Sequence, residues 1–132
     1  MSNFHTKNFS HDELKCKCGC EANEINQYAL SCLQRFRDYF GKPMILSSAY
    51  RCPDWNDKES ETGKTGPHTT GQAFDIKIYG ADAFTLQSTV GNYGFHGIGI
   101  KQKGDYSKRF IHIDTIPEKE GDSTKRPWIW SY

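Results

Sequence analysis

The 132-residue chain has no apolar run long enough to cross a bilayer, which excludes a membrane-spanning helix. It also lacks an excess of charge of one sign. Its 17 basic and 16 acidic residues give a net charge of +1, so nothing in the charge balance indicates nucleic acid or an acidic membrane as a partner. Internal repeats, low-complexity segments and dividing linkers are missing too, and no feature indicates an oligomer. The sequence therefore predicts one soluble monomeric domain over residues 1–132.

The first residues, Met1–His5, lack the basic region and the apolar stretch of a secretory signal peptide. We therefore expect the chain to be synthesised as a cytoplasmic protein. Aromatic residues, in contrast, are abundant at 14% of the chain, enough to fill a small core or to line a groove.

The five cysteines are an odd number, so at least one is unpaired within the chain. Cys16, Cys18 and Cys20 alternate along the sequence and cannot easily pair with each other, so a disulfide would have to be long-range. One alternative is a structural zinc site formed by these three with Cys52. The other is a loop of reduced thiols, which the spacing favours because it is not the two-residue gap of common zinc knuckles.

Two helices are predicted before the first strand. Ser10 and Glu13 have the spacing of a capping box, so a short helix is expected to begin there. A longer helix is expected over 23–40, where apolar residues recur at helical spacing, and Gly41 would end it. A third helix is expected around 83–90.

Strands are expected over 44–50 and 73–78, separated by a polar loop over 52–67 that shows no periodicity. Segments 97–100 and 109–115 are typical of a β-hairpin. The aromatic tail, with Trp128 and Trp130, is expected to pack back on the sheet. The pattern predicts an α+β fold in which N-terminal helices accompany a small antiparallel sheet.

Asp75 lies within an apolar strand pattern and needs a partner, because an unpaired buried carboxylate is costly to desolvate. A metal ion is one such partner. His68 precedes Asp75 by seven residues, and His112 lies in the second apolar strand. Two histidines and one carboxylate with an open position are typical of a hydrolytic zinc centre, so we predict that His68, Asp75 and His112 bind Zn²⁺.

Four motifs together resemble the M15 family of zinc D-Ala-D-Ala peptidases, a group structurally related to the Hedgehog N-terminal domain. In order, they are Ser48–Pro53, His68–Asp75, Gly97–Ile100 and Phe110–Asp114. The opening Cys16–Cys20 resembles the small single-domain subgroup common in bacteriophages and prophages. The resemblance covers nearly the whole chain and implies the same three zinc ligands and a Hedgehog/DD-peptidase fold.

The resemblance also implies that Arg51 points toward the substrate, where a guanidinium can bind a carboxylate or stabilise an oxyanion. Asp114 lies two residues after His112, so a strand places both on one face, and we predict Asp114 as the general base. Many relatives carry an acid a few residues before the last histidine ligand, whereas this chain has Ser107, Lys108 and Arg109 there. Asp114 could instead orient a zinc-binding histidine.

The function implied is a zinc peptidase of endolysin type that hydrolyses peptidoglycan stem or cross-link peptides, as a D-Ala carboxypeptidase or an endopeptidase. Such an enzyme would act on the bacterial cell wall after its release from the cell. The alternative is a module that keeps zinc and binds cell wall, or serves a phage structure, without catalysis. The missing upstream acid motivates this alternative.

Overall fold

A computed structural model describes residues 4–118 and 125–132. Their helices are α1 (His11–Leu14), α2 (Gln27–Phe40), α3 (Pro53–Glu59) and α4 (Gly80–Thr89), with 3-10 turns η1 (Gly63–Thr65), η2 (Pro67–Thr70), η3 (Val90–Tyr93) and η4 (Tyr106–Lys108). Their strands are β1 (Ile45–Ser48), β2 (Ala73–Lys77), β3 (Gly97–Lys101), β4 (Phe110–Asp114) and β5 (Trp128–Ser131). The strands form one sheet in the order β1-β2-β4-β3-β5, antiparallel except for the parallel pair β3–β5. The predicted α+β fold is confirmed.

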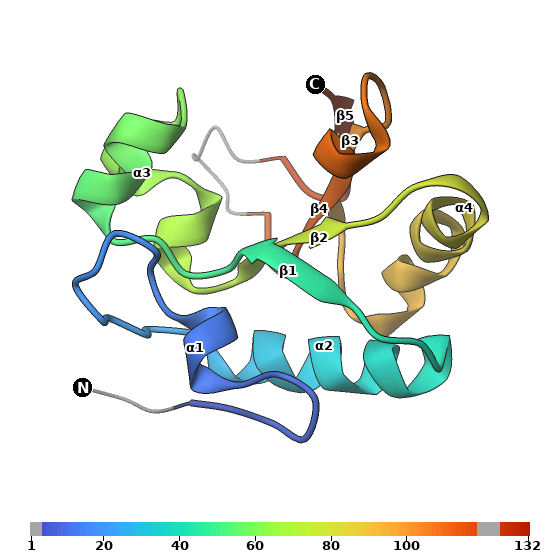
Figure 1. Cartoon of the computed structure of the whole chain (residues 1–132), viewed down its shortest axis with the longest axis horizontal. Helices are drawn as coiled ribbons and strands as arrows, with labels where there is room; N and C mark the ends of the chain where they lie inside the picture. Colours follow the sequence, from blue (N-terminus) through green and yellow to red (C-terminus); the bar gives the residue numbers. More distant parts are fainter. Residues whose placement is uncertain (1–3, 119–124) are drawn as a thin grey trace.

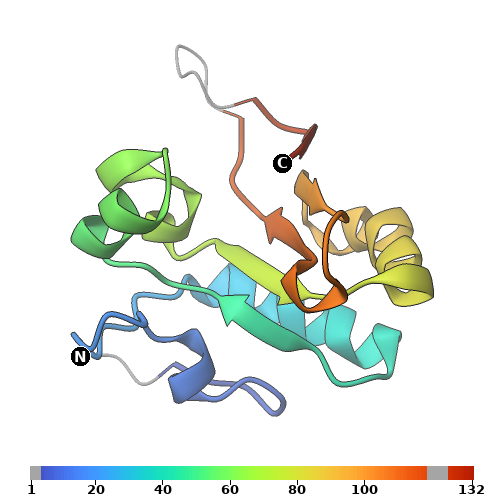
Figure 2. The same ribbon diagram turned by 45° about the horizontal axis from the view of Figure 1, so that its top comes forward.

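Helix α2 covers one face of the sheet, as Figures 1 and 2 show. Leu33 and Phe36 on this helix are fully buried against the core. The helix begins later than expected because the side chain of Asn26 accepts the backbone N–H of Ala29 at 2.9 Å and caps it. It ends at Gly41, whose left-handed backbone (φ 73°) confirms the expected stop. No helix in the described ranges is long and apolar enough to cross a membrane.

The short first helix forms as predicted. The hydroxyl of Ser10 accepts the backbone N–H of Glu13 at 3.2 Å, and the Glu13 carboxylate accepts the backbone N–H of Ser10 at 3.2 Å. These two bonds satisfy backbone donors that the helix itself leaves unpaired. The cap holds Leu14 in the core.

The prediction of an irregular loop over 52–67 is wrong, because this segment contains α3 and η1 and ends at Pro67, where η2 begins. Pro53 stands at the first helical position, where its fixed φ favours a helix and its missing N–H costs nothing. Asn56 is the only buried residue of α3. The helix therefore carries no apolar stripe, and hydrophobic periodicity could not reveal it.

The two central strands separate the core from a polar face. Phe74 and Ile76 of β2, with Ile111 and Ile113 of β4, lie in the hydrophobic core. Strand side chains alternate between faces, so Asp75, His112 and Asp114 point to the opposite side. The alternation places the carboxylates and the imidazole on one surface of the sheet.

Two glycines of β3 make room on that polar face. A Cβ at Gly97 would collide with the carboxylate of Asp114, and a Cβ at Gly99 would collide with the indole of Trp130. Glycine inside a strand often marks such a close approach. The alternation of glycines in β3 thus lets side chains from both neighbouring strands meet across it.

The aromatic tail forms the edge strand β5, which pairs with β3 so that Gly99 is opposite Trp130. Trp130 packs on the polar face of the sheet as expected, with its ring centroid 5.1 Å from that of His112. Trp128 is exposed, so only one of the two tryptophans packs closely.

Gly71 and Gly41 make a matched pair for testing how closely the chain before β2 packs against the segment that leads into α2. Both have a left-handed backbone, but a Cβ at Gly41 would meet nothing closer than the backbone carbonyl of Tyr39 at 3.9 Å, whereas a Cβ at Gly71 would collide with the backbone carbonyl of Glu24. We expect Gly41→Ala to lower the free energy of unfolding by about 1 kcal/mol and Gly71→Ala by roughly 3 kcal/mol, because overpacking adds to the backbone strain. Urea unfolding measures both. Equal losses would contradict the close packing at Gly71.

Candidate metal centre

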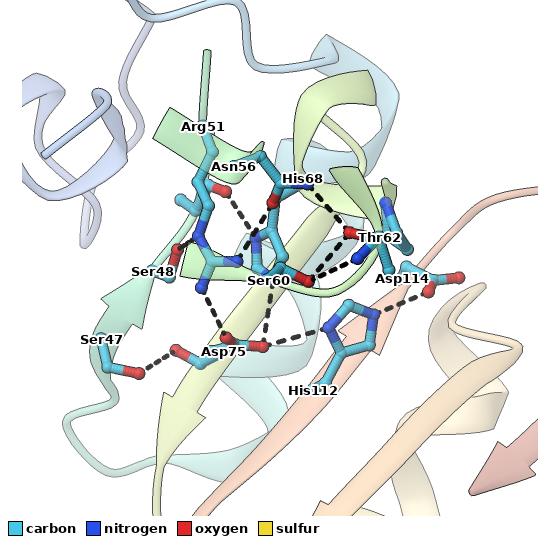
Figure 3. A network of polar contacts seen from close by, with 12 residues as sticks. Ser47, Ser48, Arg51, Asn56, Ser60, Thr62, His68, Asp75, His112 and Asp114 are labelled. Atoms are coloured by element: carbon cyan, nitrogen blue, oxygen red, sulfur yellow. Dashed lines mark hydrogen bonds and ion pairs between the residues drawn. The ribbon is translucent and has the colours of Figure 1, made fainter. Parts of the chain in front are cut away.

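His68, Asp75 and His112 meet on the polar face of the sheet (Figure 3). Asp75 and His112 are direct cross-strand partners in the β2–β4 pair, and η2 delivers His68. Oδ1 of Asp75 lies 3.2 Å from Nε2 of His68 and 3.1 Å from Nδ1 of His112. All three residues are buried, with exposed fractions of 5%, 7% and 2% in sequence order. The structure brings together the three residues that the sequence predicts as ligands.

Hydrogen bonds set which nitrogen of each histidine faces the centre. Nδ1 of His68 lies 2.7 Å from the backbone carbonyl of Ala49, so this nitrogen carries a proton and donates it. Nε2 of His112 lies 2.8 Å from Oδ2 of Asp114 and likewise donates to it. In the neutral rings, the lone pairs of His68 Nε2 and His112 Nδ1 are then left to face Asp75. This is the arrangement that metal-binding histidines need.

The spacing of these donor atoms fits zinc. Zn–N and Zn–O bonds of about 2.0–2.1 Å in a tetrahedron place the ligand atoms about 3.3 Å apart. The two distances to Asp75 Oδ1 are close to this value. Two imidazoles and one carboxylate are also a ligand set that zinc accepts with a fourth position open.

Asp114 is fully buried, and its carboxylate accepts hydrogen bonds from other residues besides His112. Nε of Arg126 donates to its Oδ1 at 2.8 Å, and Nη2 of Arg126 donates to its Oδ2 at 2.8 Å. The backbone N–H of Ile116 also donates to Oδ1, at 3.3 Å. Both carboxylate oxygens therefore have donors already. The general-base role stays a prediction, and these contacts favour the alternative, in which Asp114 orients His112.

Arg51, the other residue predicted to act on substrate, projects toward Asp75 from just after β1. Its Nη2 lies 3.6 Å from Oδ2 of Asp75. Its Nε donates to the hydroxyl of Ser48 at 2.9 Å, and its Nη1 donates to the side-chain carbonyl of Asn56 at 3.2 Å. Three neighbours thus fix the plane of the guanidinium beside the metal-binding group (Figure 3).

The centre opens into a cleft of about 1070 Å³. Its walls come from α3 and the turns after it on one side and from the C-terminal segment on the other, including Arg126, Trp130 and Tyr132. The wall formed by α3 and the turns after it is mainly polar, whereas Trp128, Trp130 and Tyr132 lie in the C-terminal wall. A cleft of this size accommodates several residues of an extended peptide.

A comparison with protein families finds one match, the model described as Peptidase M15, over residues 2–114. The chain belongs to the peptidase M15 family. No significant match was found among curated proteins or among solved structures. The matched segment includes all three predicted metal ligands and Asp114 but ends before Arg126 and β5. Peptidases of this family typically depend on zinc, in agreement with the donor atoms described above.

One functional neighbour in this peptidase, Arg126, was not anticipated from its sequence, whereas the aromatic tail with Trp130 was expected to pack on the sheet. Arg126 pairs with Asp114, and Trp130 covers Gly99 beside His112. The sequence feature that could have indicated these contacts is the pair of glycines in β3, because residues without a side chain leave room for large side chains from adjacent segments. His96 is exposed and does not line this cleft.

The carboxylates around His112 shift its pKa in the metal-free peptidase. Burial lowers the pKa of His112, but the hydrogen bonds to Asp114 and Asp75 outweigh burial and raise it above the ordinary value. Burial likewise raises the pKa of Asp114, but His112 and Arg126 together hold it below its usual range. The imidazolium is therefore favoured when no metal is bound, and a metal ion must displace a proton from Nδ1.

This shift predicts a pH dependence of stability. A raised pKa in the folded state gives stability that is complete below the unfolded pKa of about 6.5 and is lost as pH rises through the folded pKa. For metal-free protein, the free energy of unfolding should fall as pH rises above 6.5, by at most about 1.4 kcal/mol per pH unit for one proton. His112→Gln should lack this component. Urea unfolding of both proteins with chelator and reductant at several pH values tests it, and equal slopes would contradict it.

Proposed function

We propose that this M15 peptidase is a zinc enzyme that hydrolyses peptidoglycan stem or cross-link peptides, in the manner of an endolysin. The observation that carries the proposal is the fixed orientation of two histidines, His68 by the carbonyl of Ala49 and His112 by Asp114, around the carboxylate of Asp75. The chain would be made in the cytoplasm and would act, as a monomer, on the bacterial wall after release.

His68, Asp75 and His112 would hold the zinc ion. Bound zinc supplies a Lewis acid that polarises a peptide carbonyl and lowers the pKa of water. Asp114 keeps a proton on Nε2 of His112 and so keeps Nδ1 free for the metal. Arg126 supports this bond by neutralising the buried carboxylate.

Arg51 would bind the substrate. Its three nitrogens each have one partner on the scaffold, and each terminal nitrogen carries a second N–H. These two remaining donors lie in the cleft wall and can bind a terminal carboxylate or a developing oxyanion. Trp130 and Tyr132 offer apolar surface to the peptide along the opposite wall.

The substrate class rests on the family and on this cleft, which suits both a D-Ala carboxypeptidase and an endopeptidase. A carboxypeptidase would use Arg51 for the terminal carboxylate, whereas an endopeptidase would extend its peptide through the cleft past both sides of the metal. Mass spectrometry of the products from a defined muropeptide distinguishes them, because only the first releases a free terminal D-alanine.

One observation favours a second candidate, a zinc-containing module that binds cell wall without cleaving it. Oδ1 of Asp114 accepts from Arg126 and the backbone N–H of Ile116, and Oδ2 accepts from Arg126 and His112, so four donors fill the roughly four acceptor sites of this carboxylate and leave none for a water molecule. In the described part of the cleft, the carboxylates outside this network are those of Glu59 and Glu61. Either of these would have to accept the proton if Asp114 does not.

The enzyme proposal predicts that wild type reduces the turbidity of purified cell walls and releases new amine groups. His68→Ala should lose one zinc ion per chain and the activity with it, because a metal ligand is removed. The matched control is His96→Ala, an exposed histidine outside the cleft, which should keep both. Elemental analysis and the wall assay measure the two effects. Wall binding by zinc-loaded wild type without amine release would support the second candidate instead.

The role of Asp114 predicts a separate pattern. Asp114→Asn and Arg126→Gln should each weaken zinc affinity by about 10–100-fold, since both disturb the partner of His112. Excess zinc should then restore turnover in either variant. Zinc affinity is measured by competition with a chromogenic chelator, and circular dichroism checks that each variant is folded. Full zinc binding with turnover lost in Asp114→Asn alone would show instead that Asp114 is the general base.

A further inference from the structure

A second group of potential metal ligands lies away from the histidine centre. The sulfur atoms of Cys16, Cys18, Cys20 and Cys52 all lie within 4.8 Å of one another. Cys16 Sγ and Cys18 Sγ are 3.5 Å apart, and Cys18 Sγ and Cys52 Sγ are 3.7 Å apart. None of these cysteines is in a disulfide.

These separations match the edges of a metal tetrahedron. Zn–S bonds of about 2.3 Å in tetrahedral geometry place sulfur atoms about 3.8 Å apart. A disulfide would instead need about 2.05 Å. Four thiolates in a tetrahedron are a ligand set typical of structural zinc.

The backbone is folded to bring the alternating cysteines together. In an extended strand, residues four apart, such as Cys16 and Cys20, are roughly 13 Å from each other, too far for their sulfurs to share one ion. Here Gly19 (φ 97°) and Glu21 (φ 64°) adopt left-handed conformations and curl the loop. The backbone N–H of Cys16 donates to the carbonyl of Ala22 at 2.8 Å and closes the loop.

The fourth cysteine comes from a different part of the chain. Cys52 occupies the N-cap position of α3 without making a side-chain capping bond, and it directly follows Arg51. Its backbone N–H donates to Cys16 Sγ at 3.3 Å, a contact that stabilises a thiolate. The adjoining segments are also joined where the backbone N–H of Tyr50 donates to the carbonyl of Leu14 at 3.1 Å. The loop after α1 thus lies against the start of α3 (Figure 1).

We propose that Cys16, Cys18, Cys20 and Cys52 bind a second zinc ion that fastens the N-terminal loop to the segment carrying Arg51. Cys16 is buried in the core but Cys18 and Cys20 are exposed, so hydrophobic burial does not hold this part of the loop in place. Four metal–sulfur bonds supply the missing restraint. The ion has no open position and shares no ligand with the histidine centre, so its role is structural and its binding is measured separately from the peptidase centre.

The test compares zinc content in protein purified under reducing conditions. Wild type should contain two zinc ions per chain. The double variant Cys18→Ser/Cys20→Ser should contain one, and so should His68→Ala, each having lost a different ion. The control is Cys32→Ala, which removes a cysteine outside the cluster and should keep two. Because Cys18 and Cys20 are exposed, their replacement leaves the core intact.

Replacing zinc with cobalt distinguishes the cysteine site from the histidine site by absorbance. Metal-free protein reloaded with Co²⁺ should show intense thiolate-to-cobalt charge-transfer absorbance, which the double cysteine variant loses and His68→Ala retains. Absence of this absorbance in wild type, or a single zinc ion that only His68→Ala loses, would overturn the proposal while leaving the peptidase centre untouched. A disulfide within the cluster, found by mass spectrometry after purification under reducing conditions, would overturn it as well.

Discussion

The hydrogen bond between Nε2 of His112 and Oδ2 of Asp114, 2.8 Å long, is the contact on which the metal centre depends. It decides which ring nitrogen of His112 faces Asp75 and His68. A buried carboxylate alone would be too costly to keep charged, so Arg126 must neutralise it with two further bonds. Gly97 in turn must lack a side chain, since a Cβ there would occupy the space of the Asp114 carboxylate. This one hydrogen bond thus explains why position 97 is a glycine and why Arg126, just before β5, lies beside Asp114.

Much of this architecture could be predicted from local pattern. The apolar stripe of α2 and the hairpin of β3 and β4 follow from periodicity, and the structure has both. The alternation of strand residues also placed Asp75 and His112 on one face, because a period of two leaves no other choice once Phe74 and Ile111 are buried. The five residues predicted for the site, including His68 and Arg51, do lie together.

The remaining features depend on contacts that leave no mark in local sequence. The carbonyl that holds His68 belongs to the backbone of Ala49, and any residue type could provide it. Arg126 is twelve residues from Asp114, and their pairing exists only because β5 returns parallel to β3. Helix α3 lacks an apolar stripe, so its formation was missed, although Pro53 marked its start. The four cysteines converge only through left-handed turns at Gly19 and Glu21, and their spacing alone favoured free thiols.

The central claim is that zinc binds Nε2 of His68, a carboxylate oxygen of Asp75 and Nδ1 of His112 while Asp114 keeps its bond to Nε2 of His112. Anomalous diffraction at the zinc edge from crystals of the zinc-loaded protein tests this most directly. The account predicts a peak about 2.1 Å from each of these three atoms, with the bond between His112 and Asp114 intact. No peak in this cluster, or a zinc ion bound to Nε2 of His112 in place of Asp114, would contradict it.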